Sequence, residues 1–239
     1  RALGFEYVHE VSFGVDLVAH AYKKLFDEAK GKYYITANCP TIVEMIEKYH
    51  PDLVPNLAPV VSPAIAAAMV ARDLHGNDAS VVYIGPCIDI KDEINLYADG
   101  KRIDAALTFT ELRRLFDESN IQEKTVSMSD FDPPYGYWGA LYPLPAGILR
   151  AAGIKRDLVS SNVITASGKE DITEAISDFN RHIDTIRHHF NLFFCQGCLL
   201  GPGMIRHDER FRRRSLVRQY AEKRVAQPDK EQWEQEMER

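Results

Sequence analysis

The stretch Asn191-Leu-Phe-Phe-Cys-Gln-Gly-Cys-Leu-Leu-Gly-Pro-Gly203 places two cysteines between an apolar run and a glycine-rich turn. A short apolar run that ends in turn residues is typical of a buried strand. Cys195 and Cys198, two of the four cysteines in the chain, therefore follow directly after a predicted strand. The glycines allow the backbone to approach a bulky group closely, and Pro202 stiffens the same turn.

Length and composition exclude several classes of protein. The chain has 239 residues, of which 45% are hydrophobic, and this is enough for one large domain or two small lobes. No apolar run reaches the roughly 20 residues of a membrane helix, and no signal pattern opens the chain. We expect no membrane insertion and a cytoplasmic location. The net charge of −6 argues against general nucleic-acid binding.

Short β-branched or aromatic runs alternate with helical patterns, which is typical of parallel sheets with crossover helices. The predicted strands are 7–12, 33–36, 80–85, 105–109, 162–165 and 191–194. The predicted helices are 15–28, 41–49, 64–74, 110–118 and 172–190, the fourth with Thr110 as its N-cap. The aromatic, proline-rich stretch 132–145 is predicted to be an ordered, packed loop. Residues from 205 onward are predicted to form one or two surface helices.

The other two cysteines also follow predicted strands. Cys39 ends the run "YYITANC" and Cys87 ends "VVYIGPC". Ligands of parallel α/β sheets bind outside the carboxyl ends of the strands. We therefore expect three strands to bring Cys39, Cys87, Cys195 and Cys198 to one sheet edge, as a site rich in sulfur.

Several interpretations of these cysteines are open on the residues alone. A single cysteine at a strand end is most often a small buried hydrophobic residue. The closely spaced pair is compatible with a redox couple, although such a pair normally opens a helix and Pro202 opposes one here. A disulfide framework fits poorly with a large cytoplasmic domain. Structural zinc accepts four thiolates but usually takes two close pairs. Iron-sulfur clusters commonly take scattered cysteines, so we favour a cluster.

The cysteine motifs carry a family resemblance. In order, "TANCP", "IGPCIDIKDE" and "FCQGCLLGPG" resemble the three cysteine motifs in the catalytic domain of iron-only (FeFe) hydrogenases. The segment "DAALTFTELRRLF" is similar to the one that follows the second motif in that family. The segment "YGYWGALYPLPAGILRAAG" resembles the family's glycine-rich loop and helix near the active site. The resemblance extends over most of the chain.

The resemblance implies a fold, a cofactor and its ligands. It implies two α/β lobes with mainly parallel sheets flanked by helices, and a metal cluster in the cleft between them. We expect lobes at 1–98 and 99–204, a helical tail at 205–239, and a ferredoxin-like domain before Arg1. By match of motif, the ligands of a 4Fe-4S cluster are the four cysteines, and Cys198 bridges to a two-iron subcluster with carbon monoxide and cyanide ligands.

The chain departs from the motifs of the active family members. Asn38 stands where those enzymes have a cysteine that shuttles protons, and Ile90 stands where they have a lysine that binds cyanide. Lys91 is one residue away from that position, and Glu93 matches the acid of the motif; we expect Glu93 to pair with Lys91 or to lie on a solvated face. The first helix reads Tyr22-Lys-Lys-Leu25 where the family places the carboxylates of a proton path.

Further departures concern the rest of the predicted pocket. The family separates its last two cysteines by three residues, whereas Cys195 and Cys198 are separated by two. Ser62 matches the family's Ser-Pro pair, but Val61 replaces the lysine before it. The resemblance also implies that Trp138 lines the pocket, together with Tyr135, Tyr137 and Tyr142, while a plain core is the alternative.

These losses favour a protein that keeps the 4Fe-4S cluster for electron transfer or for redox or gas sensing. The alternatives are a slow hydrogenase with a two-iron subcluster and a scaffold whose cluster is structural. The expected partner is a redox protein or a fused ferredoxin-like or signalling domain. The arginines between 206 and 224 are predicted to form either a solvated helix face or a docking surface for an acidic partner. His182 and His189 are predicted to share one face of a surface helix.

Overall fold

The structure is a computed structural model that describes residues 1–96, 103–155, 157, 160–206, 208–226 and 230–238. Its longer elements are α1 (Ser12–Glu28), α2 (Pro40–Tyr49), α3 (Pro63–His75), β1 (Val82–Gly85), α4 (Ile90–Leu96), β2 (Ala105–Thr108), α5 (Phe109–Glu118), α6 (Gly147–Ala151), β3 (Val163–Ser167), α7 (Lys169–Ile186), β4 (His189–Phe193), α8 (Arg210–Ala226) and α9 (Lys230–Glu238). Short 3-10 turns are η1 (Pro51–Asn56), η2 (Glu123–Thr125), η3 (Trp138–Leu141) and η4 (Cys198–Leu200).

The named strands form two parallel sheets of two strands each. β1 pairs with β2, with Val82 opposite Ala105. β3 pairs with β4, with Val163 opposite His189. The predicted α/β class with parallel strands is confirmed. The expected single sheet edge for all the cysteines is wrong, because the strands before Cys87 and Cys195 belong to different sheets.

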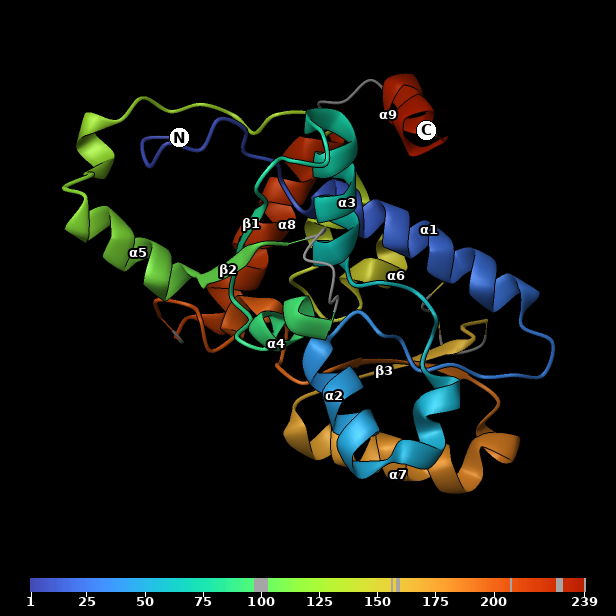
Figure 1. Ribbon diagram of the computed structural model, residues 1–239. Coiled ribbons are helices and arrows are strands. Elements are labelled where there is room, and N and C mark those ends of the chain that lie inside the picture. The colour runs from blue at the N-terminus through green and yellow to red at the C-terminus, as the bar shows by residue number, and fades with distance from the viewer. Residues whose placement is uncertain (97–102, 156, 158–159, 207, 227–229, 239) are drawn as a thin grey trace.

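Helices cover both sheets. α2 and α7 lie beside β3 at the bottom of the view in Figure 1, while α5 continues from the end of β2 on the other side. The expected lobe boundary between residues 98 and 99 lies outside the described residues, and the division into two lobes remains a prediction. Sheet pairing nevertheless crosses that position, because β1 pairs with β2. None of the described helices has the length and apolar character needed to cross a membrane.

Four of the predicted elements need correction. Instead of a strand over 7–12, the described chain has one bridge between His9 and Asp132 and then enters α1 at Ser12. The predicted strand 33–36 contributes only bridges, in which Ile35 pairs with Leu57 and with Phe190. Isolated extended segments of this kind have the composition of strands but lack a continuous partner.

The remaining corrections concern helix ends. α5 begins one residue earlier than predicted, because the N-cap is Thr108 rather than Thr110 and forms a capping box with Glu111. α7 ends at Ile186 instead of 190, because Arg187 adopts a left-handed conformation with φ 54°. Residues 189–193 then form β4, so His189 lies in a strand and not on the face of a helix.

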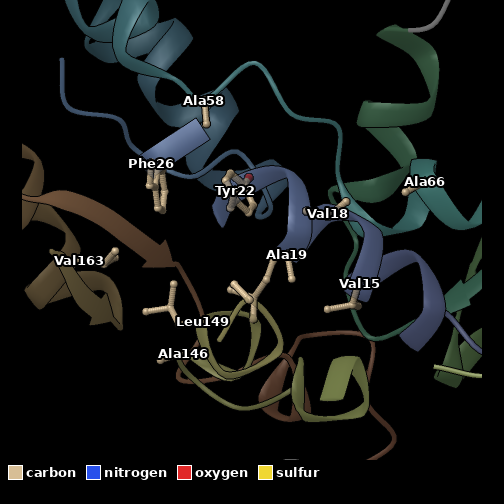
Figure 2. Packing of buried hydrophobic residues seen from close by; sticks show 12 residues of the cluster. Val15, Val18, Ala19, Tyr22, Phe26, Ala58, Ala66, Ala146, Leu149 and Val163 are labelled. Atoms are coloured by element: carbon tan, nitrogen blue, oxygen red, sulfur yellow. The ribbon is translucent and has the colours of Figure 1, made fainter. Parts of the chain in front are cut away.

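α1 is the central helix of one hydrophobic core. Figure 2 shows Val15, Val18, Ala19, Tyr22 and Phe26 along this helix, with Ala146 and Leu149 across from them. These residues recur at helical spacing, so one face of α1 is apolar. The Tyr22 side chain is fully buried. A second core, which includes Ile35, Ile42, Ile172, Phe179 and Phe190, joins α2, α7 and β4.

Asp16 anchors the aromatic loop to α1. Its carboxylate accepts hydrogen bonds from the backbone N–H groups of Tyr137 (2.5 Å) and Gly139 (2.6 Å). Only glycine fits at 139, since a Cβ there would lie 2.0 Å from the carbonyl oxygen of Ser12. The 132–145 stretch is therefore packed, as predicted. Burial raises the pKa of Asp16 to about 7, although both backbone hydrogen bonds oppose this rise.

The buried Asp16 predicts a pH-dependent stability. Because its pKa is higher in the folded protein than in the unfolded chain, its contribution is complete below about pH 4 and is lost as the pH rises to about 7. The stability of the wild type relative to Asp16→Asn should fall by about 4 kcal/mol over that interval. Urea unfolding of both proteins across the pH range measures this difference. A difference that does not change with pH would mean that Asp16 stays ionised throughout.

Candidate metal centre

The first cysteine motif runs beside β4. Thr36 donates its backbone N–H to the carbonyl oxygen of Phe190 (2.8 Å) and its hydroxyl to the side chain of Asn191 (3.2 Å). The Tyr22 hydroxyl accepts the N–H of Ala37 at 2.9 Å. Pro40 then opens α2, which suits the first turn of a helix. Cys39 is thereby held next to the strand that leads to Cys195.

The second and third motifs are joined by their backbones. The N–H of Gly203 donates to the carbonyl oxygen of Pro86 (2.8 Å), directly before Cys87. The carbonyl oxygen of Gly203 in turn accepts the N–H of Thr110 at 3.1 Å. A Cβ at Gly201 would lie 2.6 Å from the Pro86 oxygen, so this approach requires glycine.

The four thiols lie in one neighbourhood. Burial raises the pKa of the Cys198 thiol well above its ordinary value, and the thiols of Cys39, Cys87 and Cys195 raise it further. Burial and then the thiol of Cys39 raise the pKa of Cys87 to about 12. All four cysteines are free and partly exposed. Four such groups repel one another as thiolates, so a cation bound among them would lower their pKa values and release their protons.

Backbone N–H groups already lie at two of these sulfurs. For Cys39, hydrogen bonds from the backbone at Phe194 and Ile42 oppose the rise that burial causes in the pKa. For Cys87, the backbone at Asp89 and Ile90 acts in the same way. Within the described part of the chain, no three Cys, His, Asp or Glu side chains are close enough to hold a single metal ion as they stand. The donor set of four thiols, with backbone donors, fits an iron-sulfur cluster.

Residues 1–202 match the family described as "Iron only hydrogenase large subunit, C-terminal domain". The chain belongs to this family. It is 29% identical over 170 residues to iron hydrogenase 1 of Clostridium pasteurianum, an alignment that covers 64% of the chain. The chain spans only 30% of the length of that curated relative.

Solved structures of [FeFe]-hydrogenases share the fold. A variant of the enzyme from Chlamydomonas reinhardtii matches with a TM-score of 0.66 at 19% identity, over 92% of this chain and 74% of the other. A structure described as revealing stepwise assembly of the H-cluster gives the same TM-score, identity and coverage. These likenesses confirm the predicted hydrogenase-like architecture.

Asn38, at the family's proton-shuttle position, is buried and has no hydrogen-bond partner for its side chain. It is 1% exposed, and within the described residues neither Nδ2 nor Oδ1 is paired. Its backbone oxygen accepts the hydroxyl of Tyr142 at 2.5 Å. The pKa of Tyr142 is raised by burial and then by the thiols of Cys198 and Cys39. Tyr142 is therefore close both to Asn38 and to the thiols.

Both expectations for Glu93 are wrong. Lys91 pairs with Glu111 on α5 at 2.5 Å, with both side chains about two-fifths exposed. Glu93 is partly buried instead of solvated, and its Oε2 atom is shielded without a partner in the described part of the chain. Burial raises the pKa of Glu93 to about 7, while a hydrogen bond with Ser62 opposes this rise. Ile90, at the family's lysine position, is 3% exposed and offers no charge.

The other pocket candidates occupy defined places. Ser62 is the N-cap of α3, where its hydroxyl accepts the N–H of Ile65 at 3.4 Å. Trp138 lies in η3, and the guanidinium of Arg150 is 4.2 Å from the centre of its ring. Its predicted role in the pocket remains a prediction. Tyr83 was missed by the sequence analysis; its pKa is raised by burial and then by Cys198, Cys87 and Glu93, so it lies beside the same groups.

Several basic residues of the tail contact the rest of the chain. Arg210 donates to the side chain of Gln196, inside the third cysteine motif. Arg213 donates to the carbonyl oxygen of Leu199 at 3.1 Å. Arg224 is 6% exposed and binds both carboxylate oxygens of Asp130. α8 is therefore more than a solvated helix face, since these arginines attach it to the site and to the aromatic loop.

His189 has a structural role. Its Nδ1 accepts the N–H of Tyr34 at 3.1 Å, and its ring stacks on Phe26 with 4.0 Å between centroids. Burial lowers its pKa to about 4. The neutral ring belongs to the packing between α1 and β4, so the prediction that His189 shares a surface-helix face with His182 is wrong.

Gly197 and Gly76 provide a matched test of the cysteine loop. Both have nearly the same backbone angles, with φ 97° and ψ 144° for Gly197 and φ 95° and ψ 154° for Gly76. A Cβ at Gly197 would lie 2.7 Å from the Pro143 oxygen, whereas nothing lies within 4 Å of one at Gly76. Alanine at either position costs about 1–3 kcal/mol in backbone strain. Gly197→Ala should lose more stability than Gly76→Ala in urea unfolding, because it adds a steric clash. Equal losses would contradict the close packing of this loop.

Proposed function

We propose that this member of the iron-only hydrogenase family binds a 4Fe-4S cluster through Cys39, Cys87, Cys195 and Cys198. The cluster serves electron transfer or the sensing of redox state or gas rather than rapid turnover of dihydrogen. The observation that carries the proposal is that backbone hydrogen bonds join the three segments that carry the four thiols. The N–H of Gly203 donates to the oxygen of Pro86, and the N–H of Thr36 donates to the oxygen of Phe190 in β4.

The surroundings of the thiols support a cluster. Buried thiols with raised pKa values are costly to ionise, so a cationic centre that replaces their protons stabilises the thiolates most. A cluster also needs N–H donors to sulfur, and the amides at Cys39 and Cys87 supply them. The glycines of the third motif let this loop approach the turn before Cys87 closely. When bound, the cluster would supply one-electron redox chemistry.

The chain's own residues argue against fast proton transfer. The amide of Asn38 has no ionisable proton in the physiological range. Tyr22 begins the stretch Tyr22-Lys-Lys-Leu25, where the resemblance places the carboxylates of a proton path. Its hydroxyl accepts the N–H of Ala37 inside an apolar core. Figure 2 shows this helix face lined by hydrocarbon side chains. General acid-base groups contribute about a hundred- to ten-thousand-fold in rate, so their loss removes most of the turnover.

Iron and sulfide analysis tests the proposal. Protein prepared without oxygen should contain about four iron and four acid-labile sulfide per chain. Reduction with dithionite should produce an electron paramagnetic resonance signal. Cys195→Ser should lose or alter both the iron and sulfide content and the resonance signal, because a serine hydroxyl is a harder ligand than a thiolate and binds cluster iron poorly. The matched control is Gln196→Ala in the same loop, which removes no thiol and should keep the cluster.

The other outcomes are equally specific. Zinc without iron, or no metal at all, would refute the proposal. About six iron, together with infrared bands from carbon monoxide and cyanide, would show a two-iron group beside the cluster and favour a slow hydrogenase. A cluster that cannot be reduced or oxidised would favour the structural scaffold.

A further inference from the structure

Asn38 has a side chain that the protein itself does not satisfy. The residue is 1% exposed, and its two polar atoms have no partner among the described residues. An unpaired buried amide is destabilising, and native proteins rarely keep one without a reason. The backbone on both sides is held, because Ala37 donates to Tyr22 and the Asn38 oxygen accepts from Tyr142. The chain therefore fixes this amide in the interior.

A second unpaired group lies in the same interior region. The Oε2 atom of Glu93 is shielded and has no partner in the part of the chain that the structure describes. Tyr22 connects the two groups, since its hydroxyl contacts Ala37 next to Asn38 and is also influenced by the Glu93 carboxyl. Tyr83 connects Glu93 to the thiols in the same way. Asn38 and Glu93 are thus both buried polar groups near Tyr22.

The surroundings indicate what the amide binds. The thiols near Asn38 act as acceptors once ionised, so a donor from its side chain would add to the backbone N–H groups that already lie at Cys39 and Cys87. The amide of Asn38 supplies two N–H donors. A neutral donor fixed in a dry place interacts strongly with an electron-rich atom bound to metal.

We propose that Asn38 is a positioning residue that donates a hydrogen bond from Nδ2 to an electron-rich ligand on iron, either a cluster sulfide or a small terminal ligand. This inference rests on the proposed iron site. It assigns Asn38 a tuning role: the amide stabilises negative charge on the ligand and favours the reduced state, but it does not transfer a proton. The competing explanation is a buried water that satisfies Asn38 and makes the residue purely structural.

Asn191 provides a matched control. It is also a buried asparagine, at 0% exposure, but its side chain is satisfied by Thr36 and Thr165. Leucine has a similar size to asparagine and cannot hydrogen-bond. In cluster-free protein, Asn191→Leu should lower the urea midpoint of unfolding, because the hydroxyls of Thr36 and Thr165 lose a hydrogen-bond partner. Asn38→Leu should leave the midpoint unchanged or raise it, because it removes an unpaired amide.

The second measurement uses protein reconstituted with ferrous iron and sulfide alone. Asn38→Leu should bind as much iron as the wild type, but its reduction potential should shift to more negative values, since a donor to the cluster is lost. The reduction potential of Asn38→Ser, which keeps a donor, should lie between those of the wild type and Asn38→Leu. Infrared spectra with added carbon monoxide distinguish a terminal ligand from a sulfide as the acceptor, because only a terminal ligand would give a band that shifts in Asn38→Leu.

Each failure has its own signature. A urea midpoint that falls in cluster-free Asn38→Leu as far as in Asn191→Leu would show a structural amide and overturn the inference. An unchanged potential in iron-loaded Asn38→Leu, together with the absence of a carbon monoxide band that shifts in this variant, would overturn it as well, while leaving the proposed function intact. A wild type that takes up no iron under these conditions would overturn both.

Discussion

The hydrogen bond from the N–H of Gly203 to the carbonyl oxygen of Pro86 joins two parts of the molecule that the sequence keeps far apart. It connects the glycine-rich loop after β4 to the turn after β1, and those strands belong to separate sheets. Glycine at 201 and 203 is required because a Cβ at either position would come within 3 Å of the Pro86 oxygen. This contact brings the turn that carries Cys87 next to the loop that carries Cys198.

A second set of contacts holds the first motif against the same site. The segment before Cys39 is tied to β4 through Thr36 and to α1 through the Tyr22 hydroxyl. Tyr22 therefore has two effects in this chain. It supports the loop that carries Cys39, and its ring belongs to the apolar core around α1. On the proposed function, the cysteine loops would hold the cluster while this core would take the place of a proton path.

The buried and unpaired side chains around the site also bear on proton transfer. Ile90 is buried where the family has a lysine, and Glu93 is left without a cation. Lys91 does not neutralise Glu93, because it forms an ion pair with Glu111 instead. Adjacent positions on a helix face different directions, so a shift by one residue moves a charge to another side of α4. The side-chain amide of Asn38 and the Oε2 atom of Glu93 are left without partners among the described residues.

The sequence by itself determined the α/β class, most of the helices, the three cysteine motifs and the family. Such features depend on local periodicity, on turn residues and on the order of motifs, which are readable along the chain. Tertiary structure decided that the strands form two sheets, that His189 is in a strand, that Glu93 is partly buried and does not pair with Lys91, and that arginines of α8 contact the third motif. These outcomes depend on which distant segment lies opposite each residue, and no local pattern contains that information.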